Sequence, residues 1–170
     1  GAAAPRGIGF ATARRFAQEG WAVALLDIDA SGVDAARQRL SEEAEVPTVG
    51  LAVDVTDADS IQRSVSAIAE AGLPPVGALA NIAGLASPVP FLDVDLALWH
   101  KVIDVNLTGT FLMCQAYLPQ MIDNGYGRIV NVTSSAVKSP IDVLGLSNGA
   151  RSGLTGFVAG LARRTVEHNV

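Results

Sequence analysis

The chain has 170 residues, of which 49% are hydrophobic, and this length suits one folded domain with its own core. There are 17 acidic and 12 basic side chains, which give a net charge of −5, and no cluster of Lys or Arg has the pattern of a nucleic-acid-binding surface. Charge and composition therefore argue against nucleic acid as a partner.

Cysteine content and hydrophobic stretches bear on where the protein works. The single cysteine, Cys114, cannot form an internal disulfide, which favours a reducing, cytoplasmic setting. Residues 71–92 and 105–122 carry no charged side chain, but prolines interrupt the first stretch and polar residues the second. We expect both to be buried in a soluble protein, with no membrane span. The chain starts without Met and ends on EHNV, and we expect it to be a piece of a longer protein.

Short apolar runs alternate along the chain with segments of helical periodicity. The runs predict strands at 22–26, 49–53, 77–81 and 128–132. Helical spacing predicts helices around 13–17, 33–40 and 61–68, and over about 96–122 and 146–167. Gly20 is expected to end the first helix, and Thr56 and Asp57 to cap the third. The alternation predicts an α/β fold with a doubly wound parallel sheet in three layers (αβα), formed by a single domain over 1–170.

The opening segment GAAAPRGIGF places Gly1, Gly7 and Gly9 just before the first helix. Glycines let the backbone approach a pyrophosphate, whose charge meets N–H groups at the helix start, although such turns also occur without a ligand. Asp27 follows Gly9 by 18 residues, at the end of a predicted strand, where a carboxylate accepts hydrogen bonds from adenosine ribose hydroxyls. This carboxylate would repel a 2′-phosphate and Ile28 adds no positive charge, so NAD is favoured over NADP. The alternative is that Asp27 only begins a turn.

Motifs along essentially the whole chain resemble the classical short-chain dehydrogenase/reductase family. The glycine turn resembles TGxxxGIG, VDVTD (53–57) resembles the adenine-side acidic segment, and NIAG (81–84) resembles NNAG. DVNLTG (104–109) and GRIVNVTSS (127–135) are similar to the segments that carry the family's catalytic Asn and Ser. The resemblance implies a Rossmann fold that here lacks the first strand and the C-terminal strands. The cofactor-binding residues that it implies are Gly1, Arg6, Gly7, Ile8, Gly9, Asp27, Asp54, Val55, Asn81, Ala83, Gly84 and Arg151.

Four catalytic positions follow from the same resemblance. Asn106 would kink a long helix and hold a water, and Ser134 would hydrogen-bond the substrate carbonyl. The plain alternatives are an Asn bonded to a carbonyl one turn back and a Ser that caps a turn. Ser147 stands where the family has Tyr, and Arg151, on the same helical face, stands where it has Lys. Arg151 can donate to ribose hydroxyls and favour an alkoxide, but it cannot relay a proton, and Ser147 is too short to replace a phenol.

The chain also departs from the family pattern elsewhere. Its glycine turn is two residues longer, with Pro5 and Arg6 in the extra length, and Arg6 either reaches the pyrophosphate or is only solvated. Ile82 replaces an amide in NNAG. Lys138 and Asp142 either pass a proton to the site through water or are only solvated.

The sequence alone does not decide between two functions. The first is an NAD-dependent oxidoreductase that transfers a hydride between nicotinamide and a carbonyl or secondary alcohol, such as a 3-oxoacyl thioester or another small ketone. The alternative is a catalytically impaired NAD-binding module that acts through binding or a partner. The resemblance further implies a homodimer or homotetramer assembled through the two long helices. No spacing of Cys and His side chains suggests a metal site.

Overall fold

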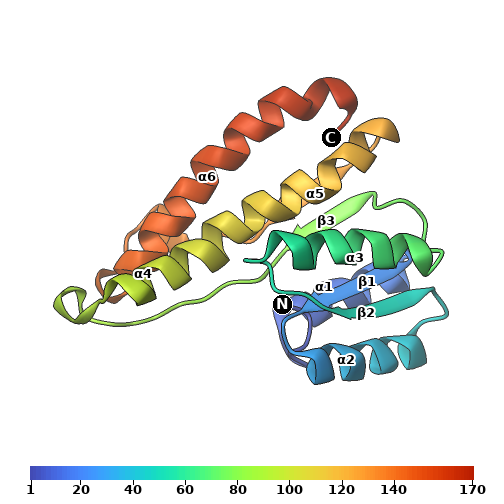
Figure 1. The fold of residues 1–170 in the computed structure, drawn as a ribbon, viewed down its shortest axis with the longest axis horizontal. Coiled ribbons are helices and arrows are strands. Elements are labelled where there is room, and N and C mark those ends of the chain that lie inside the picture. Colours follow the sequence, from blue (N-terminus) through green and yellow to red (C-terminus); the bar gives the residue numbers. More distant parts are fainter. The chain divides into compact units, whose positions relative to one another are not determined.

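Figure 1 shows the computed structural model, which describes residues 1–170 and divides into two units, Gly1–Pro75 and Val76–Val170. The elements of the first unit, in chain order, are α1 (Ile8–Gln18), β1 (Val23–Asp27), α2 (Ala30–Glu43), β2 (Thr48–Ala52) and α3 (Ala58–Glu70). β1 and β2 form a parallel pair in which Val23 lies opposite Thr48 and Asp27 opposite Ala52. Each strand is joined to the next by a helix, as the sequence predicts.

The first unit packs its own core from apolar side chains of different sizes. α1 and α2 contribute buried residues at helical spacing, and β1 contributes alternate positions, so the three elements close around a common interior. Members of this core include Phe10, Ala13, Ala17, Val23, Leu25, Val33, Ala36 and Leu40. The end of α1 is fixed as predicted, because Gly20 adopts a φ of +84°, which favours glycine. Asp57 caps α3 as predicted, whereas the side chain of Thr56 bonds to Asp54.

The second unit holds the other parallel pair and the longest helices. Its main elements are β3 (Ala78–Asn81), α4 (Leu96–Ile103), a π-helical turn (Asp104–Thr108), α5 (Gly109–Asp123), β4 (Arg128–Asn131) and α6 (Gly145–Thr165). Short 3-10 helices cover Phe91–Asp93, Ser135–Val137, Asp142–Leu144 and Val166–His168. β3 and β4 pair from Ala78 opposite Arg128 to Asn81 opposite Asn131. No helix of the structure has the length and hydrophobicity needed to cross a membrane.

The predicted elements agree closely with the observed ones. All four strands are present with ends that shift by no more than one residue, and every strand pair is parallel. The one long helix predicted over 96–122 is instead two α-helices joined by the π-helical turn, and Figure 1 shows them following each other along one continuous coil. The expected kink at Asn106 corresponds to this turn, because Asn106 is its central residue.

Candidate functional site

The two extra residues of the glycine turn form a turn of their own. The backbone N–H of Gly7 donates to the carbonyl oxygen of Ala4 over 2.9 Å, which closes a four-residue turn with Pro5 and Arg6 at its centre. Pro in the second position and Gly in the fourth are the residues that such turns prefer. The insertion is therefore accommodated locally and leaves the start of α1 intact.

The start of α1 has the properties of an anion site. Gly7 is the N-cap, no side chain caps the helix, and its first turn contains no acidic residue. The first N–H groups of α1 are consequently available to an external acceptor. Gly9 is required by packing, because a Cβ there would collide with the carbonyl oxygen of Gly1. The structure thus brings Gly1, Gly7, Ile8 and Gly9 together at one helix terminus.

Asp27 lies at the end of β1 and holds the glycine turn. Its Oδ2 accepts a hydrogen bond from the N–H of Ala3 over 2.9 Å and lies 3.4 Å from the backbone nitrogen of Gly1. Its Oδ1 accepts from the N–H of Asp29 over 3.1 Å. Burial alone would raise the pKa of Asp27, but the hydrogen bonds from the backbone N–H groups of Ala3 and Asp29 lower it. The hydrogen bond from Asp29 shows that Asp27 organises a local turn, and its binding of an adenosine ribose stays a prediction.

Asp54 and Val55 follow β2 in the same unit. The Asp54 carboxylate accepts hydrogen bonds from the backbone N–H and the hydroxyl of Thr56, over 2.8 and 2.7 Å, and so closes the turn that leads to α3. Val53 donates its N–H to the carbonyl oxygen of Asp27 over 2.8 Å, which ties the ends of the two strands together. This edge of the unit therefore gathers Asp27, Asp54 and Val55 as the sequence predicts.

Asn81 joins the two strands of the second unit. Its Nδ2 donates to Oδ1 of Asn131 over 2.9 Å, and the Sγ of Cys114 lies 3.7 Å from the same nitrogen. Asn81 and Asn131 are also direct partners in the strand register. The side chain of Asn81 thus stabilises the carboxyl end of the β3–β4 pair, next to Ala83 and Gly84.

Arg151, Gly84 and Asn106 meet at one point in the second unit. Arg151 on α6 is only 7% exposed, and its Nη1 donates to the carbonyl oxygen of Val132 over 2.8 Å. A Cβ added to Gly84 would collide with Nη2 of Arg151 and would lie 3.2 Å from Oδ1 of Asn106. Two side chains predicted from separate motifs, those of Arg151 and Asn106, therefore lie against the same glycine. Burial lowers the pKa of Arg151, but a guanidinium remains charged in proteins.

Asn106 is held by a segment that the sequence does not single out. It is completely buried, its Nδ2 donates to the carbonyl oxygen of Leu85 over 2.7 Å, and its Oδ1 accepts from the N–H of Leu85 over 3.0 Å. The alternative of an Asn bonded to a carbonyl one turn back is therefore wrong. π-helical turns are rare and occur frequently at functional sites. A water held by Asn106 stays a prediction.

Ser134 and Ser147 are not joined by a hydrogen bond. Ser134 caps the 3-10 helix Ser135–Val137 by accepting the N–H of Ala136 at its Oγ, over 3.1 Å, as the plain alternative expects. Its hydroxyl proton is still available for donation. Ser147 is 9% exposed and lies on the same buried side of α6 as Arg151.

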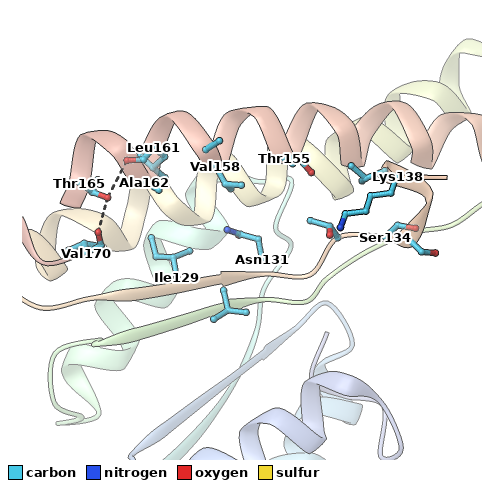
Figure 2. Close-up of a pocket in the computed structure, with 15 residues that line it drawn as sticks. Ile129, Asn131, Ser134, Lys138, Thr155, Val158, Leu161, Ala162, Thr165 and Val170 are labelled. Atoms are coloured by element: carbon cyan, nitrogen blue, oxygen red, sulfur yellow. Dashed lines mark hydrogen bonds between the residues drawn. The ribbon is translucent and has the colours of Figure 1, made fainter. Parts of the chain in front are cut away.

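A cavity of about 930 Å³ lies between β4 and α6. Its walls are mostly apolar, and Figure 2 shows Ser134 and Lys138 at one end and Thr165 and Val170 at the other. Ser147 and Arg151 do not line it. The structure therefore places Ser134 and Lys138 on one cavity and gathers Arg151 with Gly84 and Asn106. No group of three His, Cys, Asp or Glu side chains in residues 1–170 is arranged to hold a metal ion.

Two functional groups of this site escaped the sequence analysis. They are the backbone of Leu85, which fixes Asn106, and the carbonyl of Val132, which fixes Arg151. Both act through main-chain atoms, which every residue carries, so no residue type could have indicated them.

Comparison with known proteins gives consistent matches. A sequence model of the family described as short chain dehydrogenase matches residues 2–170. D-threitol dehydrogenase of Mycolicibacterium smegmatis is 37% identical over 139 residues, which are 82% of this chain and 53% of that protein. This chain thus spans about half the length of that relative.

Solved structures show the same fold. A metagenomic short-chain oxidoreductase in complex with NADP has a TM-score of 0.90 at 28% identity, with 99% of this chain and 75% of that chain covered. NAD+-bound xylitol dehydrogenase has a TM-score of 0.89 at 29% identity, with 95% and 62% covered. These matches confirm the predicted α/β Rossmann fold.

Proposed function

The chain belongs to the short-chain dehydrogenase family, and from this premise we propose that it is an NAD-dependent oxidoreductase that transfers a hydride between nicotinamide and a carbonyl or secondary alcohol. Residues 1–170 would form a single NAD-binding Rossmann domain. The observation that carries the proposal is the position of Arg151 beside Gly84, against which Asn106 also lies, because it retains a fixed cation at the family's Lys position.

The residues present suit a dinucleotide. The uncapped start of α1 offers N–H groups to a diphosphate, and Gly1, Arg6, Ile8 and Gly9 belong to the same turn. The carboxylate of Asp27 would accept the adenosine ribose hydroxyls and would repel a 2′-phosphate, which supports NAD as the cofactor. Solved relatives carry either dinucleotide, so the choice of NAD rests on this carboxylate.

Each proposed catalytic side chain has a separate task. The cofactor supplies the hydride. Arg151 stabilises negative charge on the reacting oxygen and donates to a ribose hydroxyl, while Asn106 keeps Leu85 in place beside it. Ser134, on the wall of the cavity between β4 and α6, donates its hydroxyl to the substrate carbonyl oxygen, and the fixed charge of Arg151 acts on that oxygen from outside the cavity wall. Lys138 lines the cavity with Ser134, so we assign it the supply of a proton through water, a task that Ser147 cannot perform in place of Tyr.

Substrate, assembly and location complete the proposal. The largely apolar cavity between β4 and α6 supports a small carbonyl or alcohol compound as the substrate, such as a 3-oxoacyl thioester or another small ketone. Exposed apolar side chains on α4 and α5, namely Leu96, Trp99 and Phe111, support a homodimer or homotetramer. A cytoplasmic location is supported by the buried, unpaired Cys114.

A second function is favoured by Ser147. It forms no hydrogen bond with Ser134, and its short side chain carries a poorly acidic hydroxyl at the position of the family's proton donor. In this alternative the protein binds NAD and a partner without turnover.

Steady-state NADH oxidation by the full-length protein, measured against a panel of ketones, distinguishes the two functions. The Ser147→Tyr, Arg151→Lys double variant is the comparison, since restoring a positioned proton donor should raise turnover by about 10²–10⁴-fold. Measurable activity of the parent that disappears in Ser134→Ala supports the oxidoreductase. A parent that binds NADH but is inert, beside an active double variant, supports the binding module. A parent without calorimetric heat at millimolar NADH would rule out both.

A further inference from the structure

A basic pocket lies beside the glycine turn and shares only Arg6 and Gly7 with the residues assigned to the dinucleotide. It has a volume of about 290 Å³ and is formed in the first unit by the turn Ala4–Gly7, one side of α1, and α2. Four arginines line it, and no acidic side chain does: Arg6, Arg14, Arg15 and Arg39. Residues 1–75 contain 11 acidic side chains and only six basic ones, all Arg, so most of the unit's positive charge gathers at this pocket.

Two of these arginines are fixed side by side. One carboxylate oxygen of Glu43 forms an ion pair with Arg14, whose Nε lies 2.6 Å away, and the other accepts a hydrogen bond from Nε of Arg39 over 3.0 Å. The guanidinium of Arg39 also lies 4.8 Å from the centre of the Phe10 ring. Because Glu43 engages the inner nitrogens, the terminal N–H groups of Arg14 are left without a protein acceptor. Such terminal groups match the spacing of phosphate oxygens.

The positive charges at the pocket are only partly neutralised. Arg15 pairs with Glu19 over 2.6 Å, and Glu43 serves both Arg14 and Arg39. Arg6 forms no ion pair, so four guanidinium groups face two carboxylates and leave an excess of two positive charges. Arg6 belongs to the two-residue extension of the glycine turn, and the turn carries it to the rim of this pocket.

We propose that this pocket binds a compact phosphate-containing anion at a site separate from the dinucleotide. The volume of the pocket is at the lower end of the range that is usual for ligand pockets, and it suits pyrophosphate or a terminal phosphate group. Arginine is the preferred residue for such anions because its planar fork donates two parallel hydrogen bonds. Arg6, in the extension of the glycine turn, would lie at the boundary between this pocket and the proposed dinucleotide site.

Calorimetric titration of the full-length protein with inorganic pyrophosphate, at constant ionic strength, tests the site. The Arg14→Gln, Arg39→Gln variant should bind pyrophosphate about tenfold or more weakly, since it loses the two fixed guanidinium groups. The matched control is Arg37→Gln, Arg63→Gln, which makes the same change in charge at the two arginines of this unit that lie outside the pocket. The control should bind as the parent does. Arg6→Gln, at an exposed turn, gives a second measure if the first variant unfolds.

Three results would overturn the proposal. The first is that the parent does not bind pyrophosphate. The second is that the pocket variant and the control show the same weakening of pyrophosphate binding, and the third is that saturating NADH abolishes pyrophosphate binding. The last result would place the anion in the dinucleotide site. The proposed function fails separately, by absence of NADH binding in a protein that still binds pyrophosphate.

Discussion

Gly84 accepts no side chain without displacing two functional groups. In Gly84→Ala the new methyl group would collide with the Arg151 guanidinium and crowd Oδ1 of Asn106. We expect the free energy of unfolding to fall by about 1–3 kcal/mol, as for other overpacked interiors, and NADH oxidation to fall with it. Urea denaturation followed by circular dichroism measures the first effect.

The control for Gly84 adds the same methyl group where space is open. Gly149 lies on α6 and no atom would meet a Cβ there, so Gly149→Ala should leave stability unchanged or raise it by up to about 1 kcal/mol. In an Arg151→Ala background the cost of Gly84→Ala should shrink, because the colliding group is absent. An undiminished cost in that background would show that Arg151 is not the source of the collision.

Cys114 offers a probe of the second unit that needs no mutation. Its thiol is 2% exposed and lies near Nδ2 of Asn81, and burial raises its pKa. Since the thiolate is the reactive form, iodoacetamide at neutral pH should modify the native protein far more slowly than the urea-unfolded protein. Mass spectrometry follows the reaction. Equal rates in both states would mean that β3 and α5 do not enclose the thiol.

At the scale of elements, the π-helical turn depends on one amide. Asn106→Leu removes both hydrogen bonds to Leu85 and should lower the free energy of unfolding by about 1–3 kcal/mol, because it leaves Leu85 main-chain groups poorly satisfied. Asn124→Ala, at the exposed end of α5, is the control and should change stability by less than about 0.5 kcal/mol. Urea denaturation of both variants provides the comparison. Equal costs would mean that Asn106 does not stabilise the turn.

The helices and strands were predictable because their signals are local. Runs such as AVALL and RIVNV are short and mainly apolar, and they are bounded by segments of a different pattern, so their strand character can be predicted locally. Gly20 and Asp57 likewise end and begin helices through their own backbone and side-chain chemistry. The break at 104–108 was anticipated as a kink through resemblance, but its π geometry depends on Leu85, some 20 residues away in sequence.

The site was predictable only as far as side-chain types reach. Resemblance pointed to Gly84, Asn106 and Arg151, and the structure brings them together. It could not reveal that Arg151 takes the carbonyl of Val132 as its acceptor, or that Ser134 caps a 3-10 helix, because those partners are main-chain groups fixed by the fold. The sequence analysis also missed the pocket around Arg14 and Arg39, because these residues lie far apart in the sequence and come together only where α1 and α2 pack in the fold.

For the molecule as a whole, acid should lower stability through Asp27. The pKa of Asp27 in the folded state is lower than the ordinary value of 3.8, so its ionised carboxylate stabilises the folded state. This stabilisation is complete at any pH at which Asp27 is also ionised in the unfolded chain. That contribution is complete above the unfolded pKa, near pH 4, and is lost as pH falls through the folded pKa. The free energy of unfolding should therefore decline on acidification below about pH 4.

Asp27→Asn isolates this part of the pH dependence. The variant should be less stable than the parent at pH 7, because the hydrogen bonds from Ala3 and Asp29 lose their charged acceptor, and the difference should narrow toward pH 3. Part of the slope should remain, since the pKa of Asp29 is also lowered by its hydrogen bond from Gly32. Asp59→Asn, which neutralises an exposed carboxylate on α3, should keep the parent's profile. Urea denaturation at a series of pH values decides the matter, and a stability difference that stays constant from pH 7 to pH 3 would show that Asp27 does not stabilise the fold through its charge.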